Sequence, residues 1–396
     1  MPTPKVILKA KRAQPFYGRH PWVFAGAIER VEGDPADGDE IDLVSHGGNF
    51  VARGLYNSQS KIRARLYCWE PDVALDAKFF RDRLARAIDL RHQTLGLGGK
   101  DRGYRVAFSE SDYLSGMVID KYGDWLSVQF TSLGLANRRA TIAEALVGLL
   151  NPRGIYLRTE KGVGKLEGVE LHDGPLWGEL PPADLVVEEN GLRFLVNLAE
   201  GQKTGYYLDQ RDNRQAVARL SAGKLVLDAF CYTGGFALHA AKAGAAEVLG
   251  VDASEPALEL ARRNAAANRL PGVSFDCADV FRHLADLAAV RRQFDVVILD
   301  PPKFARNRAA VPEALKGYRR LHQLALKLLA RDGILVSCCC TGLVTQAELE
   351  DVIAQVAVEG RRDLQILERR GPSPDHPVAV TCRESGYLKC VISRVW

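Results

Sequence analysis

Several features that would place a protein outside the cell or in a membrane are missing from this chain of 396 residues. No apolar run approaches the ~20 residues that are needed to cross a bilayer, and residues 1–6 lack the apolar core of a secretory signal. The eight cysteines include no CxxC pair and no accompanying histidine cluster, which argues against zinc and against a disulfide framework. We therefore expect a cytoplasmic protein with no membrane partner and no metal.

The chain also lacks an excess of one charge, because its formal net charge is only +4. Basic residues are nevertheless gathered in two segments without acids, residues 1–20 and 43–68: Lys5, Lys9, Lys11, Arg12 and Arg19, then Arg53, Lys61, Arg63 and Arg65. Two such patches on one small domain would suit the phosphate backbone of a nucleic acid. Charge alone supports an ordinary solvated surface equally well.

The first half of the chain divides into two regions with different predicted secondary structure. Residues 1–72 predict a small β-barrel-like module, with short strands at 5–8, 40–44, 50–56 and 62–67 separated by glycines. Residues 73–198 predict an α+β domain, with helices at 78–96 and 138–150 among strands at 105–109, 116–122, 125–130 and 154–158. Near its end, Asn190-Gly191 lies between two apolar runs and predicts a hairpin with a type I′ turn.

The third region, residues 199–396, alternates between strands and helices. Seven strands are predicted, at residues 224–228, 247–252, 273–276, 294–300, 333–338, 365–368 and 387–395. Helices rich in alanine and leucine lie between most of them. Such alternation is typical of a mostly parallel sheet with helices on both faces, so we expect an α/β fold of the Rossmann-like class here.

The first strand of this region leads into a turn that contains glycine, Asp228-Ala229-Phe230-Cys231-Tyr232-Thr233-Gly234-Gly235. Ligands of open α/β sheets lie beyond the carboxyl ends of the strands, and glycine there lets a ligand approach the backbone closely. The second strand ends in Asp252, which could accept hydrogen bonds from both hydroxyls of a ribose. The third strand leads to Asp279, which could bind an adenine amino group.

The turn differs from a dinucleotide site in two ways. It lacks GxGxxG and therefore a pyrophosphate cradle, and it opens with Asp228, which would repel a phosphate but attract a cation. S-Adenosylmethionine carries a sulfonium and an ammonium, so we predict it as the cofactor, held by Asp228, Phe230, Thr233, Gly234, Gly235, Asp252 and Asp279. The alternative is an ordinary α/β domain whose turns contain glycine and aspartate.

The fourth and fifth strands of the region end in Asp300-Pro301-Pro302-Lys303 and Cys338-Cys339-Cys340. In the usual methyltransferase sheet these strands are neighbours, so Asp300 and the cysteines would face the cofactor pocket, and we expect Asp300 to bind the cofactor too. A thiolate that adds to carbon 6 of a pyrimidine makes carbon 5 nucleophilic enough to accept a methyl group. We expect Cys338 to be buried, Cys340 to reach the pocket and Lys303 to favour the ionised thiol. The alternative is that the three cysteines only pack.

Four motifs together resemble one family, the RlmI-type bacterial 23S ribosomal RNA cytosine-5 methyltransferases: residues 202–211, 228–236, 300–304 and 340–342. The resemblance covers nearly the whole chain, and residues 18–24 (Gly-Arg-His-Pro-Trp-Val-Phe) resemble the family's PUA domain, an RNA-binding β-module. It implies a PUA-like domain at 1–72, a central α+β domain at 73–198 and a methyltransferase domain at 199–396. It further implies 23S ribosomal RNA as the substrate, Cys340 as the nucleophile and a homodimer as one oligomeric state to test.

This sequence departs from the family at the strand-five motif, where Ser-Cys-Ser-Gly is replaced by Cys339-Cys340-Thr341-Gly342. Cys339 is therefore an alternative nucleophile. No second cysteine accompanies Pro301 and Pro302, so Asp300 or a water would accept the carbon 5 proton.

The resemblance also implies contacts around the pocket. Residues 202–211 would fold over the cofactor, with Gln210 binding it and with Lys203 and Arg211 binding RNA, although each could equally be an ordinary loop or helix residue. The further residues expected to contact the substrate are Pro301, Pro302 and Lys303. The basic stretch 306–320 could grip phosphates or be a solvated helix face.

Two other functions compete with cytosine methylation. Asp300–Phe304 also resembles the motif of enzymes that methylate exocyclic amines of adenine or guanine, and those enzymes need no cysteine. The alternative of another class is a non-catalytic RNA-binding protein on a methyltransferase scaffold, because a fold does not determine a function.

Overall fold

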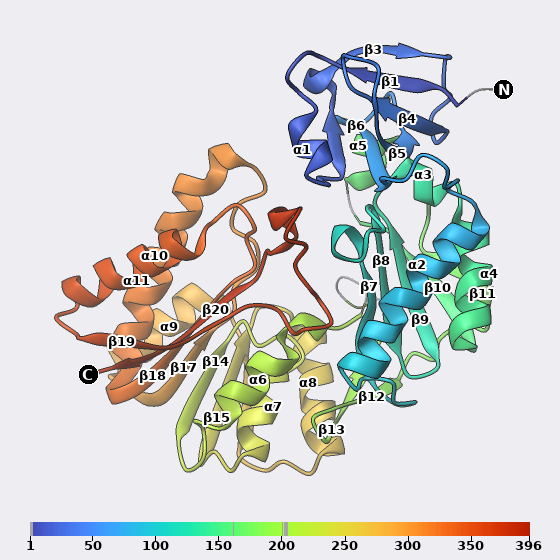
Figure 1. Cartoon of the computed structure of the whole chain (residues 1–396). Coiled ribbons are helices and arrows are strands. Elements are labelled where there is room, and N and C mark those ends of the chain that lie inside the picture. The colour runs from blue at the N-terminus through green and yellow to red at the C-terminus, as the bar shows by residue number, and fades with distance from the viewer. Residues whose placement is uncertain (1–2, 161, 200, 202–204) are drawn as a thin grey trace. The chain divides into compact units, whose positions relative to one another are not determined.

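The computed structural model describes residues 3–160, 162–199, 201 and 205–396. Their contacts divide into two compact units (Figure 1), each made of segments that are separate in sequence. The first unit contains Met1–Val187, Val196–Leu208 and Pro374–Ser385, and the second contains Glu188–Leu195, Asp209–Ser373 and Gly386–Trp396. The division into three domains after residues 72 and 198 remains a prediction.

The first unit begins with a six-stranded sheet in the order β2-β6-β5-β4-β1-β3 (Figure 1). Its strands are β1 (Lys5–Leu8), β2 (Trp22–Phe24), β3 (Ile28–Glu32), β4 (Glu40–Val44), β5 (Phe50–Tyr56) and β6 (Ile62–Cys68), and the helix α1 (Gln14–Tyr17) joins β1 to β2. Val6, Leu43 and Leu66 lie in the core of this sheet. The sequence predicts four of the strands but misses β2, which is very short, and β3, whose charged residues obscure its alternation.

A second sheet of the first unit has five strands in the order β11-β10-β9-β8-β7. These are β7 (Gly103–Phe108), β8 (Met117–Tyr122), β9 (Trp125–Phe130), β10 (Gly154–Arg158) and β11 (Gly174–Gly178). The helices α2 (Ala77–Asp89) and α4 (Arg139–Leu150) contribute Phe80, Leu84 and Leu146 to the core that they share with this sheet. The short helices α3 (Leu133–Ala136) and α5 (Val163–Glu167) lie in its connections.

In this α+β region one prediction needs correction and one strand was not predicted. The helix predicted over residues 78–96 is an α-helix only to Asp89, and Leu90–Thr94 continue it as a π-helical turn. The sequence also misses β11, because its Gly-Pro-Leu-Trp-Gly composition is unfavourable for a strand. The hairpin prediction is confirmed: β12 (Leu185–Glu189) and β13 (Leu192–Val196) pair, and both Asn190 (φ 51°) and Gly191 (φ 73°) have the positive φ of a type I′ turn.

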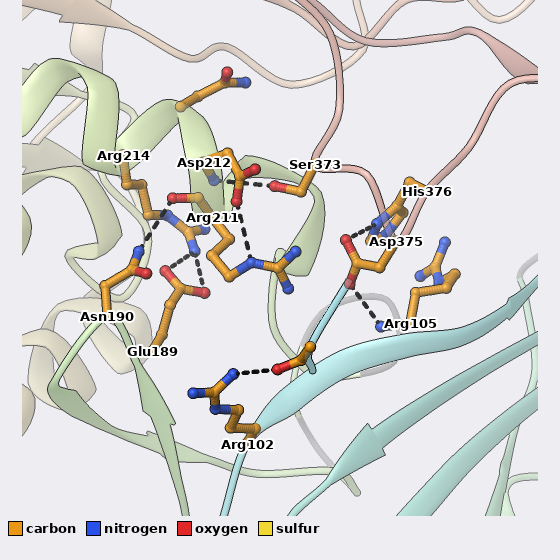
Figure 2. Close-up of polar contacts among 12 residues, drawn as sticks. Arg102, Arg105, Glu189, Asn190, Arg211, Asp212, Arg214, Ser373, Asp375 and His376 are labelled. Carbon is orange, nitrogen blue, oxygen red and sulfur yellow. Dashed lines mark hydrogen bonds and ion pairs between the residues drawn. The ribbon is translucent and has the colours of Figure 1, made fainter. Parts of the chain in front are cut away.

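The segment Pro374–Ser385 belongs to the first unit and is anchored there by buried polar groups. Asp375 accepts a hydrogen bond from the Arg105 amide at 2.9 Å, and its other oxygen lies 3.1 Å from His376 Nδ1 (Figure 2). The Asp375 carbonyl accepts a hydrogen bond from Arg91 at 2.6 Å. His376 is therefore part of a buried structural network.

The second unit is built on a seven-stranded sheet in the order β16-β15-β14-β17-β18-β20-β19 (Figure 1). Its strands are β14 (Leu225–Ala229), β15 (Glu247–Asp252), β16 (Val273–Cys277), β17 (Phe294–Leu299), β18 (Leu329–Cys339), β19 (Leu364–Arg370) and β20 (Lys389–Val395). The first five are parallel, and β20 runs antiparallel to both β18 and β19. All seven predicted strands are confirmed, as is the adjacency of the fourth and fifth, β17 and β18.

Helices cover both faces of this sheet (Figure 1). α6 (Arg211–Ala218), α7 (Gly235–Lys242) and α8 (Glu255–Ala267) pack in one layer, and α9 (Val280–Ala289), α10 (Val311–Leu328) and α11 (Gln346–Glu359) pack in the other. Leu227, Val297 and Leu335 of neighbouring strands lie in the core beneath them. Among the described residues, no helix has both the length and the apolar character of a membrane span.

Candidate active site

The turn after β14 has an unusual backbone. Phe230 (φ 65°), Tyr232 (φ 50°) and Gly234 (φ 80°) are all left-handed, and α7 begins directly afterwards. The amides of Phe230 and Cys231 both donate to the Val251 carbonyl, at 2.8 and 3.1 Å. Left-handed residues other than glycine cost about 1–3 kcal/mol each and are concentrated at functional sites, so this turn is a place where the backbone is shaped for a ligand.

Asp228 lies beneath this turn and is fully buried. Its Oδ2 accepts a hydrogen bond from the Ala237 amide at 2.9 Å, whereas Oδ1 has no hydrogen-bond partner among the described residues. The hydroxyl of Thr233 in the same turn is also buried without a partner in this part of the chain. Burial raises the pKa of Asp228 to about 8. Unsatisfied buried oxygens beside a strained turn fit a cationic ligand such as the ammonium end of S-adenosylmethionine.

Asp252 is the last residue of β15 and hydrogen-bonds to the cofactor turn. Its two oxygens accept hydrogen bonds from the amides of Tyr232 and Ser254, both at 2.9 Å. Each oxygen keeps a further lone pair, so the partly exposed carboxylate can still accept hydrogen bonds from ribose hydroxyls. Gly235 is required for packing, because a Cβ there would lie 2.5 Å from Arg214 Nε.

Asp279 is exposed and is the N-cap of α9, where its carboxylate accepts a hydrogen bond from the Arg282 amide at 2.9 Å. This capping role was not foreseen from the sequence. The predicted adenine contact remains a prediction, and it would have to use the carboxylate alongside the cap.

The segments after β17 and β18 meet, as their motifs predict. Asp300 follows β17 and its amide donates to the Ala229 carbonyl at 3.3 Å, which connects it to the cofactor turn. The Cys340 thiol donates to the Pro301 carbonyl, with 3.6 Å between sulfur and oxygen. Pro301 is buried, whereas Pro302 and Lys303 are exposed. The candidate nucleophile therefore touches the proline loop that begins at Asp300.

The three consecutive cysteines have different surroundings. Cys338 is buried as expected, and a hydrogen bond with Cys390 together with burial raises the pKa of its thiol well above the ordinary value. Cys339 is fully buried in an apolar cluster with Tyr318 and Val344. Cys340 is partly exposed, so it is the accessible thiol of the three.

A buried lysine near Cys340 was missed by the sequence analysis, which proposed Lys303 instead. Lys389, the first residue of β20, is only 8% exposed, and its ammonium donates to the carbonyls of Thr341 at 3.0 Å and Tyr387 at 3.1 Å. Burial lowers the pKa of Lys389, and the thiols of Cys339 and Cys340 act in the opposite direction. A lysine directly before the apolar run Cys390-Val391-Ile392 was the available sign.

The residues expected to fold over the cofactor are largely buried. Gln210 is 2% exposed, and its side-chain oxygen accepts a hydrogen bond from Asn213 at 2.7 Å. Arg211 is also buried, and its Nε donates to Asp212 at 3.2 Å (Figure 2). Lys203 lies outside the described residues. Both described residues stand at the start of α6, so their predicted ligand contacts remain predictions.

A buried ion pair beside this helix was not predicted either. Arg214 of α6 donates to both oxygens of Glu189, at 2.8 and 3.1 Å (Figure 2). Both side chains are almost fully buried, which makes the pair costly to break from one side only. The guanidinium lies against Gly235, the first residue of α7, so the pair stands next to the helix that follows the cofactor turn.

The basic stretch 306–320 is partly neutralised in the structure. Lys316 pairs with Glu313 at 3.1 Å, and Arg319 pairs with Glu359 of α11. Arg320 lies over the Phe281 ring, 5.2 Å from its centroid. Phosphate binding by this stretch remains a prediction.

In the first unit, His20, Cys382 and Glu384 place potential metal-ligand atoms within 4.8 Å of one another, although the sequence shows no such cluster. The Trp22 amide donates to His20 Nδ1 at 3.3 Å, and His20 Nε2 lies 3.7 Å from Glu384. His20 thus contacts both the Trp22 amide and the Glu384 carboxylate.

Comparison with known proteins extends these observations. The family of PUA-like domains matches residues 6–69, and the family of S-adenosylmethionine-dependent methyltransferases matches residues 176–388. The chain is 41% identical to ribosomal RNA large subunit methyltransferase I of Aeromonas salmonicida (strain A449) over 391 residues, 98% of each chain. It is 42% identical to the protein of the same name from Escherichia coli (strain K12) over 393 residues, 99% of each chain.

Solved structures share the fold over nearly the whole length. A protein crystallised in complex with SAH superposes with a TM-score of 0.85 at 24% identity, covering 98% of this chain and 99% of that one. A protein from Streptococcus mutans superposes with a TM-score of 0.84 at 23% identity and with the same coverage. At these identities the likeness supports the arrangement of the chain rather than a particular substrate.

Proposed function

The chain belongs to the family of S-adenosylmethionine-dependent methyltransferases that includes ribosomal RNA large subunit methyltransferase I, and we propose that it methylates carbon 5 of a cytosine in 23S ribosomal RNA. The kinship covers almost the full length of both chains and includes a PUA-like domain. S-Adenosylmethionine is the cofactor of this family. The resemblance inferred from the motifs is thus confirmed, and the cytosine chemistry is the proposal.

One observation carries the proposal: the partly exposed Cys340 thiol lies against the carbonyl of Pro301, at the edge of the sheet that holds the cofactor turn. Methylation of an exocyclic amine needs no thiol at this place. Methylation of carbon 5 does need one, because that carbon is too weak a nucleophile without covalent activation.

The chain's own residues would act in sequence on the base. The Cys340 thiolate adds to carbon 6, forming a sulfur–carbon bond and moving electron density onto carbon 5. When bound, S-adenosylmethionine supplies an electrophilic methyl group. A base then takes the proton from carbon 5, the carbon 5–carbon 6 double bond returns, and the sulfur–carbon bond breaks to release Cys340.

Asp300 is our candidate for the base that removes the carbon 5 proton. It precedes Pro301, whose carbonyl contacts Cys340, and its amide donates a hydrogen bond to the Ala229 carbonyl before the cofactor turn. Asp300 therefore lies between the cofactor turn and the candidate nucleophile. A bound water held by Asp300 would serve equally well. Pro302 and Lys303 are exposed on the same loop, in position to contact the substrate.

The residues of the cofactor turn fit the ligand that the family requires. Asp228 and Thr233 offer buried oxygens without partners among the described residues, and Asp252 offers a carboxylate at the end of β15. Phe230, Gly234 and Gly235 would line the cofactor where the turn meets α7, and Gln210 would approach it from the start of α6.

Ribosomal RNA as the substrate rests on the names of the relatives and on the PUA-like domain. The basic residues of that domain would contact phosphates, and the target cytosine would have to be single-stranded or extruded to enter a pocket. Arg211 and Lys203 are further candidates for RNA contacts. Homodimerisation remains a prediction.

The deciding experiment is mass spectrometry of nucleosides from RNA incubated with the protein and S-adenosylmethionine. RNA of large ribosomal subunits from cells lacking the endogenous enzyme is the substrate. We expect 5-methylcytidine with the wild type and with C339A, and none with C340A. A methylated purine formed by all three proteins would instead establish amine methylation through the Asp300–Pro302 loop.

The non-catalytic alternative has a separate test. Calorimetric titration with S-adenosylmethionine should show binding to the wild type and to C340A. Absence of binding to both proteins would support a scaffold without catalysis.

A further inference from the structure

Lys389 occupies an unusual place for a lysine. It begins β20, which lies between β18 and β19, and its backbone pairs directly with Cys339. Residues directly opposite each other on antiparallel strands share a face of the sheet. The lysine therefore begins on the Cys339 side of the sheet, and its ammonium reaches past the strand end to the carbonyl of Thr341, the residue after Cys340.

The Lys389 ammonium is held by carbonyl groups rather than by an acid. Two of its three protons are donated to the Thr341 and Tyr387 carbonyls, and it forms no ion pair with a carboxylate of the described residues. The acid that influences it most is Glu348, which is engaged in the capping box with Thr345 at the start of α11. A buried charge is strongly unfavourable without a counter-ion, so an anion is expected close by.

Cys340 is the residue that can provide this anion. Its thiol and that of Cys339 both interact electrostatically with the ammonium, but Cys339 is fully buried in an apolar cluster. Two further ionisable groups of the described residues near Cys340 are unsuited to stabilising a thiolate: the phenol of Tyr318 and the carboxylate of Asp300, whose loop the Cys340 thiol contacts at Pro301. Lys303 is exposed to solvent, where its charge is screened.

We propose that Lys389 is a positioning residue whose ammonium is the counter-ion of the Cys340 thiolate, so that the nucleophile is ionised before the base arrives. The Cys340 proton leaves to solvent, and no bond forms to Lys389. Once the sulfur has bonded to carbon 6 it carries no charge, and the ammonium remains held by the Thr341 and Tyr387 carbonyls. This inference rests on the proposed role of Cys340.

The same contacts of Lys389 could serve only to fix the turn after Cys340. The pKa of the Cys340 thiol distinguishes the two roles, because only a counter-ion lowers it. The pKa of Cys340 is measured from the pH dependence of its alkylation by iodoacetamide, with the modified peptide quantified by mass spectrometry. C340A identifies that peptide. The measurement needs neither RNA nor cofactor, so it can fail while the nucleoside experiment succeeds, and the reverse also holds.

The variants are K389M, which removes the charge, K389R, which keeps it, and K303M as the matched control on the proline loop. A nearby opposite charge can shift a pKa by about 1–3 units, so K389M should raise the alkylation midpoint by an amount of that order and slow alkylation at neutral pH about tenfold or more. K389R should restore the wild-type midpoint, and K303M should leave it unchanged.

Three results would overturn the proposal. They are an unchanged midpoint in a folded K389M, a shift caused by K303M instead, and a wild-type midpoint at or above the ~8.5 of free cysteine. The last result needs no variant, so the proposal stays testable if K389M does not fold. Near-ultraviolet circular dichroism and thermal unfolding establish that each variant is folded.

Discussion

The buried carboxyl of Asp228 makes the affinity for S-adenosylmethionine depend on pH. The pKa of Asp228 is raised to about 8, chiefly by burial and also by the carboxylates of Asp300 and Asp252, while the Ala237 amide and Arg214 act in the opposite direction. A cation binds the ionised carboxyl and not the neutral one. Affinity should therefore increase as the pH rises toward the pKa, and fall as the carboxyl is protonated at lower pH.

The size of the effect follows from the ionised fraction. With a pKa of about 8, Asp228 is about 1% ionised near pH 6 and about one quarter ionised near pH 7.5. Because the apparent dissociation constant is the intrinsic constant divided by the competent fraction, affinity should improve about 20-fold over this range. The sulfonium of the cofactor is a permanent charge, and a variant that cannot ionise at position 228 separates the titration of the protein from that of the cofactor's ammonium.

Isothermal titration calorimetry of the wild type and of D228N measures this dependence. D228N keeps a side chain of the same shape but cannot ionise, so we expect weak binding that does not change with pH. Equal slopes in the two proteins, or a flat wild type, would refute the assignment of Asp228 as the group that meets the cation.

Two further predictions concern His322 and Asp279. His322 is fully buried between the Tyr318 carbonyl (2.7 Å) and the Ser337 hydroxyl (2.8 Å), and burial lowers its pKa to about 4. The folded state therefore disfavours the protonated form of His322. The free energy of unfolding should fall as the pH drops below about 6.5, the pKa of an unfolded histidine. The total loss should be on the order of 3 kcal/mol once the pH is also below the folded pKa. Urea denaturation near pH 7 and pH 4.5 should show this slope in the wild type and a smaller one in H322Q; equal slopes would contradict it. For Asp279, D279A removes the N-cap of α9 and should lose about 1 kcal/mol of stability, whereas D279S keeps a capping side chain and should keep that stability. Both variants should weaken cofactor binding. Unchanged binding in both would leave the cap as the residue's only role.

The fold of the second unit was predictable because its pattern is strong and local. Buried parallel strands are continuous apolar runs, such as Val296–Leu299, and amphipathic helices separate them. The Asn190-Gly191 turn was predictable for a similar reason, since few dipeptides suit two positive φ angles. The strands that were missed, β2, β3 and β11, are short, charged or interrupted by glycine and proline, and only their neighbours in the sheet make them strands.

The candidate site was predictable where it depends on the ends of parallel strands. Asp228, Asp252, Asp300 and Cys340 lie at or directly after the carboxyl ends of four parallel strands, which share one edge of the sheet, so their proximity follows from topology alone. Asp279 shows the limit of that argument. The residue after a strand can also begin a helix, and in the structure the Asp279 carboxylate caps α9.

Lys389 could not be found in this way, because its place depends on the one antiparallel insertion in the sheet. From sequence, a lysine at the start of a strand is expected at the solvent, and 48 residues separate it from Thr341, whose carbonyl it contacts. The pairing of β20 between β18 and β19 places strands on both of its sides and brings the lysine opposite Cys339. Strand order and register, rather than any local motif, therefore place a cation near Cys340. A lysine at the start of a largely apolar central strand is the feature by which such a residue can be recognised.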